Sequence, residues 1–183
     1  CADAAGDGYI CGVPGGRQMW REVAEGDIRA GGFDLNSRWV PLYNIHKTYA
    51  GLRDAWLQAH RTDARDMLVG LTDWMMAEVS QLSDEQVQEM LRSEHGGLNE
   101  IFADVAAITG DDKYLALAHR FSHNDVLEPL LNGEDRLTGM HANTQIPKVI
   151  GFKRIADIEG NAAWDSAADF FWKDVTSKRS VSI

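Results

Sequence analysis

Three clusters of polar residues combine imidazole, amide and carboxyl side chains in a pattern suited to binding a hydroxylated small molecule. The clusters are Tyr-Asn-Ile-His-Lys at 43–47, Ser-Glu-His-Gly-Gly-Leu-Asn-Glu at 93–100 and His-Ala-Asn-Thr-Gln-Ile-Pro at 141–147. Imidazoles and amides both donate and accept hydrogen bonds, so together they could form the rim of a site for a polyol or a sugar. The candidate substrate-binding residues are His46, His95, Glu94, Asn44, His141, Asn143 and Gln145.

The middle cluster also holds the residue types of acid–base chemistry. Glu94, His95 and Glu100 could donate and accept protons. Gly96 and Gly97 allow the backbone to approach a ligand closely, because they have no Cβ atom. A structural interpretation of Glu100 stays open, since a carboxylate in the first turn of a helix stabilises the helix dipole.

Each cluster has a simpler structural interpretation as well. Pro147 suits the first turn of a helix, and a single histidine there more often makes a structural hydrogen bond than contacts a ligand. Three histidines at equivalent positions favour a shared function. Residue types that commonly cap helix N-termini stand at Asn44, Ser93, Asn143 and Thr144. The histidines at turns or in second helices are interpreted as structural, namely His60, His119 and His123.

A threefold internal repeat of about 50 residues must position these clusters. It is visible in Gly-Leu-Arg-Asp-Ala from 51, Ile-Phe-Ala-Asp-Val from 101 and Gly-Phe-Lys-Arg-Ile from 151. Leu52, Phe102 and Phe152 occupy equivalent places in the three lines. A repeat of this length indicates one stacked supersecondary unit. The three polar clusters therefore share one end of the architecture.

Each repeat is predicted to be a hairpin of two helices. Phe102, Val105 and Ala106 follow the i, i+3, i+4 spacing of a helix rather than the alternation of a strand. Gly110 and Gly160 suit the left-handed conformation that ends a helix, and the Asp or Asn that follows each can cap the next one. The predicted units are 43–91, 92–140 and 141–183, after a leader with loops at 1–42.

Stacked hairpins form either an open solenoid or a closed α/α toroid. One amphipathic hairpin cannot bury its apolar face alone, so neighbours must share a core. The apolar first helices at 101–108 and 149–158 favour an inner ring. We therefore predict an all-α fold of the α/α toroid type.

Composition restricts the class of partner. The chain has 183 residues, of which 44% are hydrophobic, and this suffices for one sizeable core. A formal net charge of −10 argues against nucleic acid and anionic membrane surfaces as partners. No apolar run approaches the roughly 20 residues that span a bilayer. The expected partner is a carbohydrate substrate, with no nucleic acid and no membrane.

Cysteine and tryptophan usage points the same way. Cys1 and Cys11 are too few for a disulfide framework or a zinc site, so no metal-binding residue is expected, and a bridge between them stays open. Six tryptophans fit an aromatic-lined carbohydrate site. Those at helical positions are expected to fill the core, namely Trp56, Trp74, Trp164 and Trp172.

Several motifs resemble the β-L-arabinofuranosidase family of glycoside hydrolases, families 127 and 146. They are Gly-Val-Pro-Gly-Gly at 12–16, Trp-Val-Pro-Leu-Tyr-Asn-Ile-His-Lys at 39–47, Glu-His-Gly-Gly-Leu-Asn-Glu at 94–100, Arg-Phe-Ser-His at 120–123 and His-Ala-Asn-Thr-Gln-Ile-Pro-Lys-Val-Ile-Gly at 141–151. The resemblance implies an (α/α)6 barrel of the six-hairpin glycosidase type. It also implies retaining hydrolysis of β-L-arabinofuranosides of plant-type glycans, with His46 and His95 contacting the arabinose hydroxyls.

The sequence departs from this family at the reaction centre. The resemblance implies a cysteine nucleophile on a zinc ion and a separate glutamate acid/base. The motifs that hold them are expected downstream of Ile183, and neither Cys1 nor Cys11 matches a zinc-binding position. The expectation is therefore a fragment of about three hairpins, inactive alone and binding no zinc, although the full-length protein would bind it. The faces that should meet the missing C-terminal part of the barrel are expected to be exposed and to favour self-association.

Two other functions stay open from the residues alone. A sugar epimerase or isomerase on a similar α/α barrel would use histidines as acid and base. A non-catalytic helical-repeat scaffold would use the same hairpins without a site. The exact glycan and the cellular compartment are likewise open.

Overall fold

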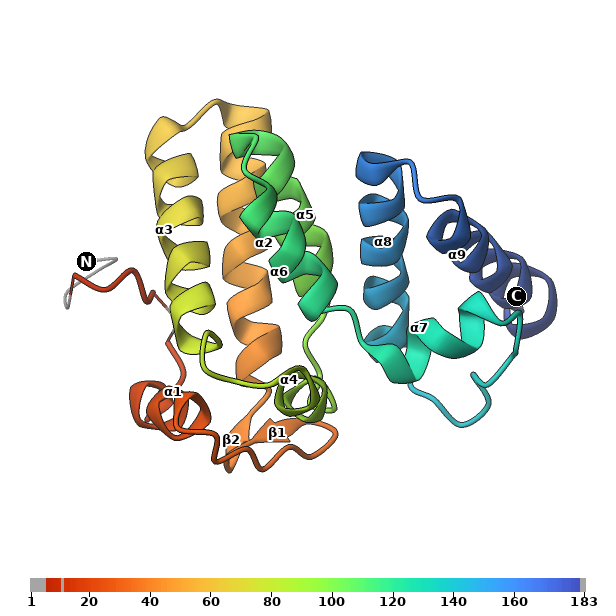
Figure 1. Ribbon diagram of the computed structural model, residues 1–183, viewed down its shortest axis with the longest axis horizontal. Helices are drawn as coiled ribbons and strands as arrows, with labels where there is room; N and C mark the ends of the chain where they lie inside the picture. The colour runs from red at the N-terminus through yellow and green to blue at the C-terminus, as the bar shows by residue number, and fades with distance from the viewer. Residues whose placement is uncertain (1–5, 11, 182–183) are drawn as a thin grey trace.

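The computed structural model describes residues 6–10 and 12–181, and nearly all its regular structure is helical (Figure 1). The all-α class expected from the apolar periodicity is confirmed. Two short strands, β1 (Asp34–Leu35) and β2 (Arg38–Trp39), form an antiparallel ribbon. Cys1 and Cys11 lie outside the described residues. Within 6–10 and 12–181, no helix combines the length and the apolar character that crossing a lipid bilayer requires.

The long helices pair into hairpins, each with its partner directly after it in the chain. The pairs are α2 (Pro41–Ala59) with α3 (Thr62–Glu78), α5 (Leu98–Thr109) with α6 (Asp112–Arg120), and α8 (Ala142–Glu159) with α9 (Ala162–Asp174). Shorter helical segments fill the remaining space, namely α1 (Gly16–Ala24), α4 (Asp84–Met90), α7 (Asn124–Leu131) and the π-helical turn η1 (Val175–Arg179).

Two of the three hairpin turns are built as the sequence predicts. Gly110 ends α5 with a φ of 73° and Gly160 ends α8 with a φ of 71°, both in the left-handed region that favours glycine. The Asp111 side chain then caps α6 by accepting a hydrogen bond from Lys113 N, and Asn161 caps α9 by accepting one from Trp164 N. The α2–α3 turn has no glycine, and His60 adopts the left-handed conformation there.

The first helices begin at residues other than those expected. Their N-caps are Val40, Gly97 and His141, and none of these side chains caps its helix. Because Pro41 fits the first position of α2, Asn44 falls inside that helix. Pro147 lies in the interior of α8, since this helix already starts at Ala142. The first-turn interpretation of Pro147 is therefore wrong, as is the N-cap interpretation of Asn44, Ser93, Asn143 and Thr144.

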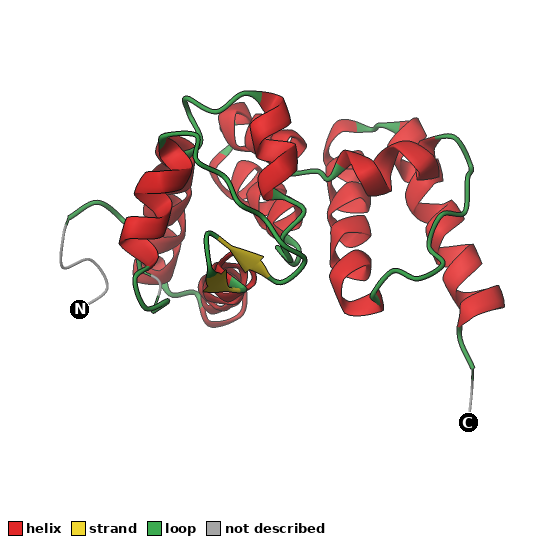
Figure 2. Ribbon diagram, turned by 90° about the horizontal axis from the view of Figure 1, so that it is seen from below, coloured by secondary structure: helices red, strands yellow, loops and turns green. Residues whose placement is uncertain are grey.

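Two apolar cores lie side by side. The larger one unites α1 to α6, with Ile155 of α8 added, and the smaller one joins α7, α8 and α9. Both views show the corresponding two groups of helices (Figures 1 and 2), and α5 packs against α8 where the groups meet. Trp74 belongs to the larger core as expected, whereas Trp172 is 66% exposed on α9. The expectation that Trp172 fills the core is wrong, because this side chain lines the open groove between α8 and α9.

The first helices of the hairpins begin at one end of the molecule. In Figure 1 the starts of α2, α5 and α8 all lie toward the lower side, and the β1–β2 ribbon lies below the start of α2. Helix α5 packs against both α2 and α8. This arrangement brings the ends of neighbouring repeats together, so residues about 50 positions apart in the repeat can meet.

The outer side of α8 and α9 is apolar. Ile146, Ile150 and Trp172 are exposed there and line a groove of about 340 Å³, with Phe171 on its wall. Exposed apolar surface of this kind marks a face that packs against something. On the opposite side, α8 is covered by α5.

Candidate functional site

His46 is held against the two glycines of the middle cluster. Its side chain is 6% exposed, and a Cβ atom on Gly96 would lie well under 3.0 Å from its Nδ1 atom. A Cβ on Gly97 would lie 3.3 Å from its Nε2 atom. Gly96 also has a φ of +59°, a conformation that favours glycine. At Gly96, only a glycine lets the backbone before α5 come this close to the imidazole.

The electrostatic environment keeps this imidazole neutral. Burial lowers the pKa of His46 to about 4, and the charges of Lys47 and Arg53 act in the same direction. A neutral imidazole has one N–H donor and one acceptor nitrogen. The Nδ1 atom is buried and has no hydrogen-bond partner among the described residues. His46 is therefore suited to hydrogen bonding with a hydroxyl group, not to holding a charge.

A row of ion pairs ties the three first helices together beside this histidine. Arg53 of α2 reaches both Glu100 and Asp104 of α5, with N–O distances of 2.9 Å each. On the other side, Arg154 of α8 contacts Asp104 at 2.7 Å. Burial opposes the charge on Arg53, but Glu100 and Asp104 outweigh it and raise the pKa of the guanidinium. This row fixes the spacing of the inner helices.

Replacing Asp104 with alanine is expected to lower the free energy of unfolding by about 2 kcal/mol, because two partly buried arginines lose their shared carboxylate. The Asp104 side chain is only 12% exposed. Urea denaturation monitored by circular dichroism measures the change.

The matched control for this prediction is Asp66→Ala. It removes an ion pair with Arg65 in which the carboxylate side chain is 73% exposed. Loss of such a solvent-exposed pair should cost about 0.5 kcal/mol at most. Equal losses in both variants would contradict the structural importance of the row.

Glu94 and His95 connect the middle cluster to the third one. The Glu94 carboxylate accepts a hydrogen bond from Thr144 Oγ1 at 3.2 Å. His95 is fully buried, with its Nδ1 atom 3.1 Å from Ser93 O and its Nε2 atom without a partner among the described residues. Burial, with Lys148 and His123 nearby, lowers its pKa. His95 thus lies behind the rim rather than on its open surface.

A buried lysine, which the sequence interpretation missed, stands beside these residues. Lys148 is 2% exposed, and its Nζ atom donates to His123 Nδ1 at 2.9 Å. Burial lowers the pKa of Lys148 to about 8, and burial together with Lys148 lowers that of His123 to about 4. The spacing of the sequence already indicates that Lys148 is buried. Thr144, Lys148 and Phe152 follow one another at intervals of four residues, which places them on the same, buried side of α8.

The structure separates the remaining candidates. His141 is exposed, and its ring meets Phe33 edge-on at 5.9 Å. Asn143 is exposed in the first turn of α8, while the Oε1 atom of Gln145 is buried without a partner among the described residues. Asn44 is exposed and two positions from His46 on α2, so the two side chains point to different sides of the helix.

The zinc site that the resemblance implies has no counterpart in this part of the chain. Across residues 6–10 and 12–181, no group of three or more His, Cys, Asp or Glu side chains is placed to hold a metal ion.

Comparison with known families identifies the architecture. The family model for the beta-L-arabinofuranosidase, GH127 catalytic domain, matches residues 1–183. No curated protein matches the chain. Three stacked helical hairpins among the described residues agree with the six-hairpin glycosidase fold of that family. The chain therefore belongs to the GH127 β-L-arabinofuranosidase catalytic-domain family, which is a family of glycoside hydrolases.

Proposed function

We propose that this chain provides part of the sugar-binding rim of a retaining glycoside hydrolase that acts on β-L-arabinofuranosides of plant-type glycans. The observation that supports it best is the neutral imidazole of His46, enclosed by Gly96 and Gly97 where α2 meets the start of α5. A neutral imidazole donates and accepts hydrogen bonds in fixed directions, so it can distinguish sugar hydroxyls by their positions without carrying a charge. The family match supports a carbohydrate as the ligand.

The neighbouring residues would orient this histidine and the ligand. The ion pairs of Arg53 with Glu100 and Asp104 hold α2 and α5 at a fixed distance. The backbone N–H groups at the start of α5 have no intrahelical partners and could donate to a sugar hydroxyl. We assign these described residues to sugar binding and not to a bond-breaking step. We expect residues 1–183 alone to be inactive as a hydrolase.

A sugar titration tests the proposal. Methyl β-L-arabinofuranoside is added to the protein while histidine ring signals are followed by nuclear magnetic resonance. We expect saturable shifts for His46 and an affinity loss of at least about tenfold in His46→Ala, the size of one lost directional contact. His60→Ala, which removes an exposed histidine at the end of α2, should bind as the unchanged protein does. Equal binding by His46→Ala would remove the basis for the rim.

We also propose that the apolar groove between α8 and α9 is the surface on which a further hairpin of the six-hairpin fold packs. The α8–α9 hairpin packs on α5 through its other side. A further hairpin on the groove would continue this stacking of neighbouring repeats. If the groove is left open, the 183-residue chain should self-associate through it. Sedimentation velocity should show dimers or larger species, and Ile150→Lys should return the chain to monomers. A monomer at all concentrations would contradict this assignment.

A further inference from the structure

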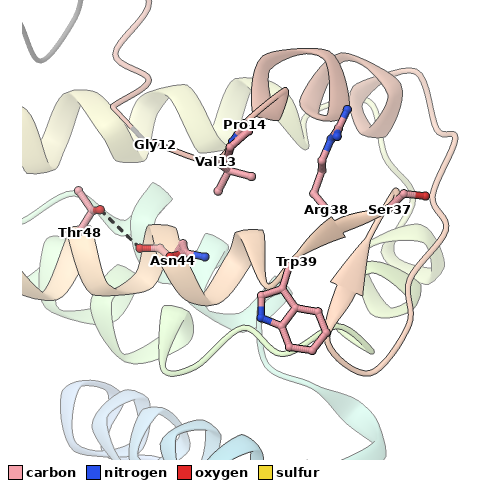
Figure 3. Close-up of a pocket in the computed structure, with 8 residues that line it drawn as sticks. All are labelled: Gly12, Val13, Pro14, Ser37, Arg38, Trp39, Asn44 and Thr48. Atoms are coloured by element: carbon pink, nitrogen blue, oxygen red, sulfur yellow. Dashed lines mark hydrogen bonds between the residues drawn. The ribbon is translucent and has the colours of Figure 1, made fainter.

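A second pocket lies on the side of α2 away from His46. It has a volume of about 520 Å³ and is bordered by Trp39, whose side chain is 71% exposed. Figure 3 shows Trp39 at the end of the ribbon, with Asn44 and Thr48 on α2 and the 12–14 segment opposite. Tryptophan is usually well buried, so an indole this exposed at the edge of a pocket marks a candidate binding surface.

The lining of this pocket is partly polar. Arg38 contributes its guanidinium, and the Nε atom of this group is buried without a hydrogen-bond partner among the described residues. Asn44 adds an amide at the opposite wall, where its Nδ2 atom donates to Val40 O. An aromatic surface with a few polar groups around it is the usual composition of a small-molecule site.

The backbone around Trp39 is strained in a way that fixes its position. Ser37 and Val40 have φ values of 60° and 38°, in the left-handed region. For the β-branched Val40 this conformation is costly and persists only when the surroundings enforce it. Val40 N donates to Phe33 O at 2.7 Å, which holds the turn that follows the ribbon. The indole is therefore presented by a rigid element.

A row of rings connects the pocket to the rim. The rings of Trp39 and Phe33 have centroids 5.8 Å apart and an angle of 31° between their planes. Phe33 in turn meets His141, one of the rim candidates, at 5.9 Å. A ligand lying on Trp39 would thus be separated from His141 by the Phe33 ring.

The other strongly exposed tryptophan has different surroundings. Trp172 lies in the apolar groove of α8 and α9, beside Ile146 and Ile150. A groove lined in this way suits another helix. The pocket at Trp39 differs because Arg38 and Asn44 line it, and polar side chains of these types suit a ligand with hydroxyl groups.

We infer that this pocket is a second sugar subsite, which binds a residue of the glycan next to the one held at the rim. The apolar face of the sugar ring would stack on the Trp39 indole, while Arg38 and Asn44 would hydrogen-bond its hydroxyls. The inference rests on the proposed function, since it assumes a glycan at the rim. Such a second subsite would make the chain selective for oligosaccharides over single sugars.

Two ligands and two variants test this inference. Affinities for methyl β-L-arabinofuranoside and for an arabino-oligosaccharide are measured by isothermal titration calorimetry. We expect Trp39→Ala to bind the oligosaccharide about tenfold more weakly, as for the loss of one stacked ring, and the monosaccharide unchanged. Trp172→Ala, which removes an equally exposed indole elsewhere, should leave both affinities unchanged. Circular dichroism confirms that each variant is folded.

The outcomes separate the two proposals. If Trp39→Ala weakens both ligands equally, or weakens neither, the second subsite is wrong, although the rim assignment stands. If the unchanged protein binds the oligosaccharide through Trp39 but not the monosaccharide, the rim assignment fails and the pocket is a sugar site on its own. If the oligosaccharide does not bind at all, the subsite is overturned.

Discussion

Acidification from pH 6.5 to pH 5 is expected to lower the free energy of unfolding by about 3 kcal/mol through His46 and His123 alone. Burial lowers both pKa values from 6.5 to about 4 in the folded protein. Between these values the unfolded chain binds protons that the folded chain excludes, so stability is present above pH 6.5 and is lost as the pH falls. His95, whose pKa is also lowered, acts in the same direction.

Urea titrations at a series of pH values measure this slope. His123→Gln should flatten it by about a third, since His46 and His95 still titrate, and a glutamine oxygen can accept the hydrogen bond from Lys148 but does not titrate. His60→Gln is the matched control, since His60 is exposed and should leave the slope unchanged. A stability profile that is flat between pH 6.5 and pH 5 would show that these histidines are not buried as neutral rings.

Replacing Gly96 with alanine is expected to abolish sugar binding at the rim and to lower the free energy of unfolding by about 3 kcal/mol. The new methyl group would occupy the space of the His46 ring, and the backbone has a φ of +59°. Because His46 is fixed on α2, either the ring or the segment before α5 must move. Binding of methyl β-L-arabinofuranoside and urea denaturation together measure the effect.

Gly110→Ala separates the cost of the left-handed backbone conformation from the cost of the clash with the His46 ring. Gly110 has a φ of +73°, but a Cβ there would meet nothing within 4 Å. Its replacement should therefore cost about 1 kcal/mol from the backbone conformation alone and leave sugar binding intact. If both alanine variants lost the same stability and both still bound sugar, the packing of Gly96 against His46 would have no functional meaning.

The hairpins could be predicted because their signals are local. Apolar spacing within one helix, a glycine at its end and a capping Asp or Asn are all read within a few residues, and Gly110 with Asp111 confirms the rule. The starts of the helices are harder to predict from the sequence, because Val40 and Gly97 provide no side-chain cap for α2 and α5. Those starts depend on neighbouring segments, not on the preferred cap residues.

Only part of the candidate site could be predicted from the sequence. The repeat placed the polar clusters at one end, but it could not show that Asn44 and His46 point to different sides of α2, which depends on how α2 is rotated in its packing. The pairing of Arg53 and Arg154 with Asp104 needs the distances between three helices. The exposure of Trp39 depends on the strained turn at Val40, which no residue preference predicts.

The two adjoining apolar cores imply that the protein does not open as one cooperative unit. Much of the seam between α5 and α8 is polar, with Asn99 Nδ2 donating to Lys148 O at 2.9 Å and Gly151 leaving room for the amide. Such a seam should separate before either core does. Native-state hydrogen exchange should then show the amides of α7, α8 and α9 exchanging as one group, at a lower opening free energy than those of α2, α3 and α5. Because α8 holds one side of the rim, a ligand that bridges the seam would slow this exchange, linking sugar binding to the order of the smaller core.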